Sequence, residues 1–503
     1  MINKVLVANR GEIAMRIFRT CRVMNIPTVA IYTHADRAAL HVRYADEAYC
    51  ISKNESDTSY LKPEEIINLA KKLGAAIHPG YGFLSENPDF ARRCEEEGVI
   101  FIGPSADTID KMGVKTEARK IMEAAGVPIV PGMKERISGV EEARSKAREV
   151  GYPIMLKALA GGGGKGMRLV HKEEDLEAAF RMSSSEAANS FGDDSIYIEK
   201  YIQNPHHIEV QVIGDKFGNV VHLGERECSI QRRNQKLVEE TPSPFVKEET
   251  RQKMLAIAVA ACKKIGYYSA GTLEFMMDKD QNFYFLEMNT RLQVEHPVTE
   301  ACTGVDIVRD MILIADGKPL PYKQEDIEFR GAAIECRICA EDPENNFMPS
   351  PGIIRIHEVP EGRNVRIDSC AYTGFEVSLH YDPMFAKLCS WGRTRESAIE
   401  NMRRALREYK ILGIKTTIPF HLRVMNNDTY LAGNYDTTFI DTKFNKEELK
   451  RSKDSDPTVA VISAALKHFE EEKEAAARAT TLPLVGESLW KHYGKLQMTA
   501  NNY

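Results

Sequence analysis

The sequence has no excess of basic residues, no dense set of cysteines and no long apolar run at its start. A formal net charge of -6 over 503 residues gives no reason to expect nucleic acid as a partner. The ten cysteines are scattered, unlike a secreted disulfide framework, so reduced thiols and a cytoplasmic location are expected. The apolar run after Met1 is too short for a signal peptide or a membrane span, so no membrane association is expected.

Short apolar runs alternate with helical patterns at the start of the chain. Residues 4–8 and 28–32 are typical of strands, and a helical pattern through Ile13, Ile17 and Cys21 lies between them. This βαβ order predicts a parallel sheet with ligands at the carboxyl ends of its strands. Runs at 75–78 and 99–102 predict further strands that end in polar or Gly/Pro turns.

The chain is too long for one core, and changes in its pattern divide it into four parts. We expect an α/β (α+β) fold with a Rossmann-like parallel-sheet domain at 1–112 and a second domain at 113–330. A β-rich third domain is expected at 331–442, with strands at 332–340, 353–359 and 374–379 and a helix at 395–409. Residues 443–503 form a charged linker and an extension with a helix expected at 458–477.

A glycine cluster follows the strand-like residues 153–157. Five of the six residues from Gly161 to Gly166 are glycine, which leaves backbone N–H groups free to surround a polyphosphate. Lys157 and Lys165 add positive charge, so we favour a phosphate clamp, and a flexible hinge is the alternative. The cluster is not a P-loop, because Gly166 follows the lysine where Ser or Thr is needed.

Two acidic residues face each other across a predicted hairpin. If Asp278 pairs with Phe283, antiparallel register places Glu274 opposite Glu287 on one face of the sheet. Two like charges there would repel unless a divalent cation lies between them, so we infer paired oxygen ligands for magnesium. The same alternation would place Asn289, Arg291, Gln293 and Glu295 on that face as the strand continues, although a solvated outer face is the alternative.

Several long stretches together resemble the biotin carboxylase family of ATP-grasp enzymes, over roughly residues 1–440. They are residues 8–14 (ANRGEIA), 78–87 (HPGYGFLSEN), the glycine cluster, 227–233 (ECSIQRR) and 287–297 (EMNTRLQVEHP). The resemblance implies that 113–330 is an ATP-grasp domain whose glycine-rich lid spans about 131–203. It also implies an ATP- and bicarbonate-dependent carboxylation of biotin on a separate carrier protein, through carboxyphosphate.

The resemblance implies a role for each matching residue. Lys115 and Lys157 would contact ATP phosphates, Glu199 and Lys200 the adenine end, and His207 and Gln231 the ribose. The full ATP set is Lys115, Lys157, Gly161, Gly162, Gly163, Gly164, Lys165, Gly166, Met167, Glu199, Lys200, His207, Gln231 and Asn234. The family often has histidine where this chain has Asn234, and a neutral amide still hydrogen-bonds nucleotide oxygens.

The remaining implied sites are for metal, bicarbonate and biotin. Two Mg²⁺ ions, for which Mn²⁺ may stand in, would be held by Glu274, Glu287 and Asn289. The catalytic residues would be Glu295, Arg291, Arg337 and Lys236, with Glu295 as the general base and Arg337 facing the ureido group of biotin. The bicarbonate and biotin pocket would comprise Lys236, Arg291, Gln293, Val294, Glu295 and Arg337.

The partners are also inferred from the resemblance. This chain has no Met-Lys-Met tripeptide of a biotinylated carrier, so the carrier protein and the carboxyltransferase are expected on other chains. Pyruvate, 2-oxoglutarate or an acyl-coenzyme A would be the final acceptor, with a slight preference for a 2-oxo acid, and a homodimer is expected. A different ATP-grasp carboxylate–amine ligase and a non-catalytic nucleotide-binding subunit remain alternatives.

Three weaker features are interpreted as structural or left open. Cys336 and Cys339 have zinc-like spacing without a second pair, so structural thiols are expected. The pair His206-His207 lacks a third histidine close in sequence, which does not favour a metal site. Trp490 and Tyr493 in the extension either dock a partner or pack within the chain.

Overall fold

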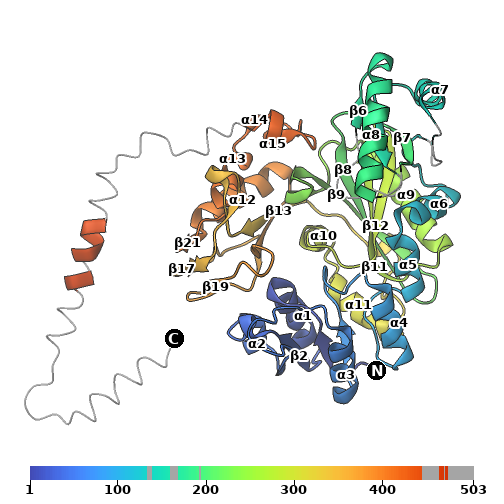
Figure 1. Ribbon diagram of the computed structural model, residues 1–503. Helices are drawn as coiled ribbons and strands as arrows, with labels where there is room; N and C mark the ends of the chain where they lie inside the picture. Colours follow the sequence, from blue (N-terminus) through green and yellow to red (C-terminus); the bar gives the residue numbers. More distant parts are fainter. Residues whose placement is uncertain are drawn as a thin grey trace, which may run out of the picture. The chain divides into compact units, whose positions relative to one another are not determined.

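The structure is a computed structural model that describes residues 1–132, 137, 139–158, 168–191, 194–444, 464–469 and 471–473 (Figure 1). It divides into two compact units, Met1–Asn445 and Lys446–Tyr503. In the second unit the described residues are helical, within the helix expected at 458–477, while Trp490 and Tyr493 lie outside the described residues. Across the described part of the chain, no helix combines the length and apolarity needed to cross a membrane.

The first sheet is parallel, as the βαβ pattern predicted. Its strand order is β3-β2-β1-β4, and β1 pairs with both β2 and β4. The strands are β1 (Val5–Val7), β2 (Thr28–Tyr32), β3 (Glu47–Cys50) and β4 (Ala76–His78), with α1 (Gly11–Val23) after β1 and α2 (Leu40–Tyr44) after β2. The strand expected at 99–102 is wrong: only Phe101 bridges Ile77, because Gly103-Pro104 follows and proline cannot continue a ladder.

The largest sheet has eight strands in the order β12-β11-β8-β9-β10-β13-β20-β18. All of its pairings are antiparallel, and it carries residues of both the second and the third expected domains. Its strands are β8 (His206–Gly214), β9 (Val220–Arg232), β10 (Gln235–Thr241), β11 (Ser269–Met277), β12 (Phe283–Asn289), β13 (Ala332–Cys339), β18 (Val365–Ser369) and β20 (Met384–Gly392).

Helices bury the apolar side chains of this sheet. Met254, Leu255 and Ala258 of α9 (Glu248–Lys264) share one core with β8, β11 and β12, and α6 (Lys115–Ala124) joins it through Met122. Ile13 and Phe18 of α1 pack in another core with Val308 and Met311 of α11 (Ile307–Ala315). That second core also contains residues of β8 and β9, so it fixes the parallel sheet against the large one.

A separate three-stranded sheet, β6-β5-β7, carries the residues that flank the glycine cluster. It consists of β5 (Ile154–Ala158), β6 (Arg168–Val170) and β7 (Ile196–Lys200), and α7 (Val140–Val150) and α8 (Leu176–Phe191) lie beside it (Figure 1). Gly161 to Gly164, Lys165, Gly166 and Met167 lie outside the described residues. The expected phosphate clamp therefore stays a prediction.

The third expected domain is β-rich, with shorter strands than predicted. The expected strand 353–359 is two strands, β16 (Gly352–Ile353) and β17 (Ile356–Glu358), and 374–379 contains only β19 (Glu376–Val377). Strand β20 was not predicted, because the buried Lys387 interrupts its apolar pattern. The expected helix is confirmed as α12 (Arg395–Glu408), capped by Thr394, whose side chain accepts from the backbone N–H of Ser397.

Candidate active site

A cavity of about 1670 Å³ lies within the first unit and collects most of the predicted site residues. This is larger than the roughly 300–1,000 Å³ of an ordinary small-molecule pocket, so it has room for a nucleotide and a second substrate. The predicted residues that line it are Lys115, Lys157, His207, Gln231, Asn234, Lys236, Glu274, Glu287, Asn289, Arg291, Gln293, Val294 and Arg337. Glu199, Lys200 and Glu295 are predicted site residues that do not line it.

The stretches ANRGEIA and HPGYGFLSEN meet at the edge of this cavity. They follow β1 and β4, which are neighbours in the parallel sheet, so both loops leave the same edge. The amide of Asn9 donates to the carbonyl oxygens of Pro79 and Tyr81, each at 2.8 Å. Gly80 has φ +66°, and a Cβ there would lie 2.9 Å from Asn9 Nδ2, so this close approach requires glycine.

The predicted pairing of Glu274 with Glu287 is confirmed, but the register near the turn is not the predicted one. Met277, not Asp278, pairs with Phe283. A register shift between Glu274 and Phe275 then brings Glu274 opposite Glu287. Asp278 instead closes the turn, where its carboxylate accepts the backbone N–H groups of Asp280 and Asn282 at 2.9 Å.

Glu274 and Glu287 lie in different environments. Glu274 is 5% exposed and accepts hydrogen bonds from Lys236 Nζ at 3.0 Å and Asn289 Nδ2 at 2.8 Å. His207 Nε2 lies 3.0 Å from its other oxygen. Burial opposes ionisation, but Lys236 and His207 outweigh it and lower the pKa of Glu274 below its usual range. Glu287 is more exposed and pairs with Lys115 at 3.0 Å.

The polar strand face expected beyond Glu287 is wrong in structure, although its residues do converge. Strand β12 ends at Asn289, and residues 290–295 form a loop that leads into α10 (His296–Thr303), with Pro297 in its first turn. The guanidinium of Arg291 donates to Asn289 Oδ1 at 2.8 Å and Gln293 Oε1 at 3.1 Å. Proline near the start of a helix and the polar loop before it explain why the alternation did not continue as a strand.

Glu86 of the HPGYGFLSEN stretch anchors this loop. Its carboxylate accepts from the backbone N–H of Thr290 at 3.1 Å and from Arg291 Nε at 2.7 Å. A residue of the N-terminal domain therefore holds the arginine that lines the cavity. Sequence reasoning quoted Glu86 within a motif but gave it no role.

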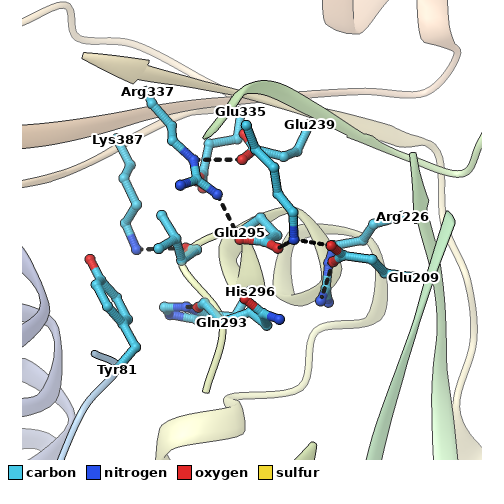
Figure 2. A network of polar contacts seen from close by, with 12 residues as sticks. Tyr81, Glu209, Arg226, Glu239, Gln293, Glu295, His296, Glu335, Arg337 and Lys387 are labelled. Carbon is cyan, nitrogen blue, oxygen red and sulfur yellow. Dashed lines mark hydrogen bonds and ion pairs between the residues drawn. The ribbon is translucent and has the colours of Figure 1, made fainter. Parts of the chain in front are cut away.

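Lys236 is the centre of a buried charge cluster (Figure 2). Its ammonium group contacts Glu295 Oε1 at 2.9 Å, Glu274 Oε1 at 3.0 Å and also Glu209 Oε1. Glu209 in turn pairs with Arg226 at 3.0 Å, and both side chains are fully buried. Burial and the charge of Glu295 raise the pKa of Glu209 to about 7.

Glu295 lies beneath the cavity, between two cations. Its second oxygen accepts from Arg337 Nη2 at 2.9 Å, opposite the contact with Lys236 (Figure 2). Burial alone would raise the pKa of Glu295, but the charges of Lys236 and Arg337 lower it well below its usual value. Glu295 is therefore ionised at neutral pH, and it is a weak base for as long as both cations contact it.

Arg337 is held on its other edge by Glu239. Its Nε donates to Glu239 Oε1 at 2.6 Å, while its backbone carbonyl lies 2.7 Å from His421 Nε2. Glu239 belongs to β10 and Arg337 to β13, two neighbouring strands of the large sheet. The guanidinium thus lines the cavity with one edge bonded to Glu239 and the other to Glu295.

Lys387, which sequence reasoning missed, ties the N-terminal domain to the loop that carries Glu295. Its ammonium group donates to the carbonyl oxygen of Val294 at 2.9 Å and pairs with Glu12 at 3.2 Å. Glu12 also accepts a hydrogen bond from the hydroxyl of Tyr81, which lines the cavity. Because these residues come from β20, α1 and the loop after β4, no spacing in the sequence predicts their contact.

At the other end of the cavity the predicted ATP residues contact one another. Glu199 of β7 pairs with Lys157 and with Arg119, and Lys200 donates to the carbonyl oxygens of Gly151 and Tyr152 at 2.7 and 3.0 Å. Arg119 was not predicted, yet it lines the cavity one helical turn after Lys115. The i, i+4 spacing on α6 is a signal that could have identified it.

Two weaker features have ordinary structural environments. Cys336 and Cys339 are both buried free thiols in β13. The ring of His206 stacks on Phe245 with centroids 3.5 Å apart. His207 instead contacts Glu274 in the site, as described above. The two adjacent histidines therefore have different partners.

Three family models match successive parts of the chain. They are the biotin carboxylase N-terminal domain at residues 1–109, the ATP-binding domain of the carbamoyl-phosphate synthase L chain at 114–323 and the biotin carboxylase C-terminal domain at 335–442. The domain boundaries at 112, 330 and 442 stay predictions.

Curated relatives and solved structures are also similar to this chain. Biotin carboxylase 1 of Bacillus subtilis is 55% identical over 444 residues, which is 88% of this chain and 99% of the relative. The 2-oxoglutarate carboxylase small subunit of Hydrogenobacter thermophilus is 50% identical over 470 residues, 93% of this chain and 99% of the relative. A crystal structure of the biotin carboxylase domain dimer of the Hydrogenobacter 2-oxoglutarate carboxylase, with MgADP, ADP and bicarbonate, superposes with a TM-score of 0.80 at 52% identity, covering 88% of this chain and 97% of that one.

Proposed function

This chain belongs to the biotin carboxylase family, and from that premise we propose how its residues carry out ATP-dependent carboxylation of biotin. ATP would phosphorylate bicarbonate to give carboxyphosphate and ADP. The carboxyl group would then pass to the ureido nitrogen of biotin, and the proton of that nitrogen would leave with phosphate. The observation that carries this proposal is the buried Lys236–Glu295–Arg337 cluster beside a cavity that also contains Glu274 and Glu287.

The nucleotide would occupy the part of the cavity lined by Lys115, Lys157 and Arg119. Phosphoryl transfer requires mainly positioning and charge neutralisation, and these three cations supply both. Before nucleotide binds, Lys115 and Lys157 contact Glu287 and Glu199, so binding would exchange carboxylates for phosphates. Glu199, Lys200, His207, Gln231 and Asn234, with the glycine cluster as lid, complete the proposed ATP set.

The donor set beside the proposed phosphates suits magnesium. Glu274, Glu287 and Asn289 offer carboxylate and amide oxygens, the ligand type that Mg²⁺ prefers. Lysine ammonium groups contact both carboxylates now, which shows that each position stabilises a nearby cation. When bound, the ions would neutralise charge on the phosphate oxygens.

Bicarbonate would lie against Arg291, Gln293, Val294 and Lys236, with Glu295 as its general base. Glu295 is ionised, which a base requires, but its two cation contacts keep it weakly basic. A movement of Arg337 from Glu295 to a substrate oxygen would remove one of these contacts. The basicity of Glu295 would therefore rise when the second substrate is in place.

Arg337 would stabilise the ureido oxygen of biotin as the neighbouring nitrogen loses its proton. A guanidinium is permanently charged and presents two edges, so it can keep Glu239 on one edge while the other binds substrate. Glu239 contacts Nε and Glu295 contacts Nη2, which leaves the Nη2 edge as the one to be exchanged.

The carrier protein and the carboxyltransferase are proposed to be separate chains, and the chain itself a homodimer. Similarity to the 2-oxoglutarate carboxylase subunit extends over 470 residues, against 444 for Biotin carboxylase 1. That longer match supports a 2-oxo acid, 2-oxoglutarate or pyruvate, over an acyl-coenzyme A as final acceptor. We propose the domain division 1–112, 113–330, 331–442 and 443–503, with the last part as a docking segment for a partner.

One assay separates this function from its alternatives. ATP hydrolysis is measured with bicarbonate, with and without free biotin. A biotin carboxylase hydrolyses ATP with bicarbonate and accelerates with biotin. A carboxylate–amine ligase would ignore biotin and respond to an amine, and a non-catalytic subunit would bind ATP without turnover. Either of these last results would contradict the proposal.

A further inference from the structure

Two buried glutamates face each other behind Arg337. Glu239 of β10 and Glu335 of β13 are directly opposite in the antiparallel register, and both side chains are 0% exposed. Figure 2 shows the two carboxyl groups together beside the guanidinium of Arg337. Within the described residues, Glu239 Oε2 and Glu335 Oε1 are buried without a hydrogen-bond partner.

No printed cation contact neutralises Glu335. The charged and titratable groups around it are Arg337 on its own strand, Glu239 on β10, Lys387 and Cys389 on β20, Arg366 and Asp368 on β18, Glu12 on α1, Tyr81, and Glu295 and His296 at the start of α10. Lys387 bonds Glu12 and Val294, and Arg366 bonds Asp368 and Glu300. Only the thiol of Cys389 donates to Glu335 Oε2, at 3.0 Å.

Two ionised carboxylates in this arrangement would be costly. Directly opposed residues on paired strands have Cβ atoms about 4.5–5.5 Å apart, so like charges there repel strongly in a buried site. Each unpaired buried oxygen adds a desolvation cost of about 1–3 kcal/mol. A single proton removes both costs, because a carboxylic acid can donate to the free oxygen of the opposing carboxylate.

The geometry assigns the proton to Glu335. Glu239 is bonded to the guanidinium of Arg337, which favours its ionised form, whereas a weak thiol donor is the partner of Glu335. Burial, and then the charge of Glu239, raise the pKa of Glu335 well above its usual value. Burial raises that of Glu239 too, but Arg337 opposes the rise.

We propose that Glu335 and Glu239 share one proton and form an acid pair that positions Arg337 for the ureido oxygen of biotin. Neutral Glu335 donates to Glu239, and Glu239 holds the Nε edge of the guanidinium. The pair presents one negative charge to Arg337 instead of two, which leaves its Nη2 edge free to exchange Glu295 for substrate. Both glutamates are positioning residues, and this inference rests on the proposed role of Arg337.

The proposal predicts an effect of pH on biotin and not on nucleotide. When Glu335 loses its proton at alkaline pH, a second negative charge appears behind Arg337 and binds the guanidinium more tightly within the protein. The ratio kcat/KM for biotin therefore falls at alkaline pH. Binding of ADP, which involves the other end of the cavity, keeps its affinity.

Glu335→Gln tests the proton directly, because glutamine keeps an N–H donor toward Glu239 and cannot titrate. The infrared spectrum of the parental protein, without substrates, should contain the carbonyl band of a protonated carboxylic acid, which disappears in E335Q. At neutral pH, kcat/KM for free biotin should stay within about threefold of the parental value. The alkaline fall should move to higher pH in E335Q, with ADP affinity unchanged.

Glu239→Gln provides the second variant. Loss of a hydrogen bond to a charged group costs about 1.5–3 kcal/mol, so kcat/KM for biotin should fall about 10- to 100-fold. The acid band should shift, since the acid loses its carboxylate acceptor, which keeps the test available if E335Q does not fold. A parental spectrum without the band, an alkaline fall unchanged in E335Q, or an unshifted band in E239Q would overturn the proposal.

The infrared measurement also separates this inference from the proposed function. It needs no turnover, so a band that vanishes in E335Q supports the acid pair even if biotin carboxylation is absent. In that case the function, and not the pair, is wrong. Biotin-dependent turnover without the band leaves the function intact and contradicts the pair.

Discussion

Individual side chains in this site are held by charged neighbours from distant parts of the sequence. Glu295 contacts Lys236 of β10 and Arg337 of β13, and Arg291 is held by Glu86 of the N-terminal domain. These contacts keep buried charges paired, which is the condition for placing them beneath a cavity without a large desolvation cost. They also mean that replacing one partner alters the ionisation of the next.

Replacement of Arg337 tests the division of roles at the residue scale. In Arg337→Ala we expect ADP affinity to stay near the parental value, while kcat for biotin carboxylation falls about 100- to 1,000-fold, as for loss of one oxyanion donor. Equilibrium titration with ADP and steady-state kinetics with free biotin give the two quantities. Arg355→Ala, at an exposed arginine of the third domain, is the control. Equal loss of ADP binding and carboxylation in R337A would contradict the assignment.

Sequence reasoning at this scale succeeded where a motif or a hairpin brings residues together. The opposition of Glu274 and Glu287 follows from counting residues through a short turn, and the structure has this pair. Glu209, Glu239 and Lys387 were not found, because they reach the site through strand order and not through spacing in the sequence. A buried lysine within an apolar strand pattern is the one signal that Lys387 offered.

Loops and strand ends set the architecture of the cavity at the scale of elements. Asn9 after β1 joins the loop after β4, and the register shift in the β11–β12 hairpin brings Glu274 opposite Glu287. The alternation rule predicted the correct residues beyond Asn289 but the wrong element. Loop geometry before α10 depends on tertiary contacts with Glu86 and Lys387, which local sequence does not encode.

Gly80 and Gly82 offer a matched pair of substitutions for this junction. Both have φ +66°, but a Cβ at Gly80 would lie 2.9 Å from Asn9 Nδ2, whereas nothing lies within 4 Å at Gly82. Both alanine variants bear the backbone strain of about 1–3 kcal/mol, and only Gly80→Ala adds a clash. We expect a larger loss of thermal midpoint and of ATPase activity in G80A than in G82A. Equal losses would show that the Asn9 contact is not needed.

The two units make different contributions to the whole molecule. All the residues that line the cavity belong to Met1–Asn445, which contains the described hydrophobic cores. Deletion of residues 446–503 should therefore leave bicarbonate-dependent ATP hydrolysis with free biotin within about twofold of the parental rate. A folded, ADP-binding truncated chain without this activity would show that the extension takes part in catalysis.

Buried histidines predict an acid limit to the stability of the fold. Burial lowers the pKa of His41 from 6.5 to about 4 and that of His78 to about 3. Because the unfolded chain binds these protons more tightly, the stability is fully present above pH 6.5 and is lost as pH falls toward 4. At pH 5 the loss from His41 alone is on the order of 2 kcal/mol.

His41→Leu should remove that part of the acid sensitivity. The thermal midpoint of the parental protein should fall between pH 6.5 and pH 5, and the fall should be smaller in H41L than in the control His171→Leu, an exposed position. A midpoint that stays level or rises on acidification would contradict the sign of this argument.

Fixation of isotopically labelled bicarbonate onto free biotin tests the central claim most directly. With ATP and Mg²⁺ the parental protein should form labelled carboxybiotin in proportion to the ADP that biotin elicits. Glu295→Gln should form none while still binding ADP, since it lacks the base for bicarbonate. ATP consumption by the parental protein without labelled carboxybiotin, or undiminished labelling by E295Q, would contradict the account.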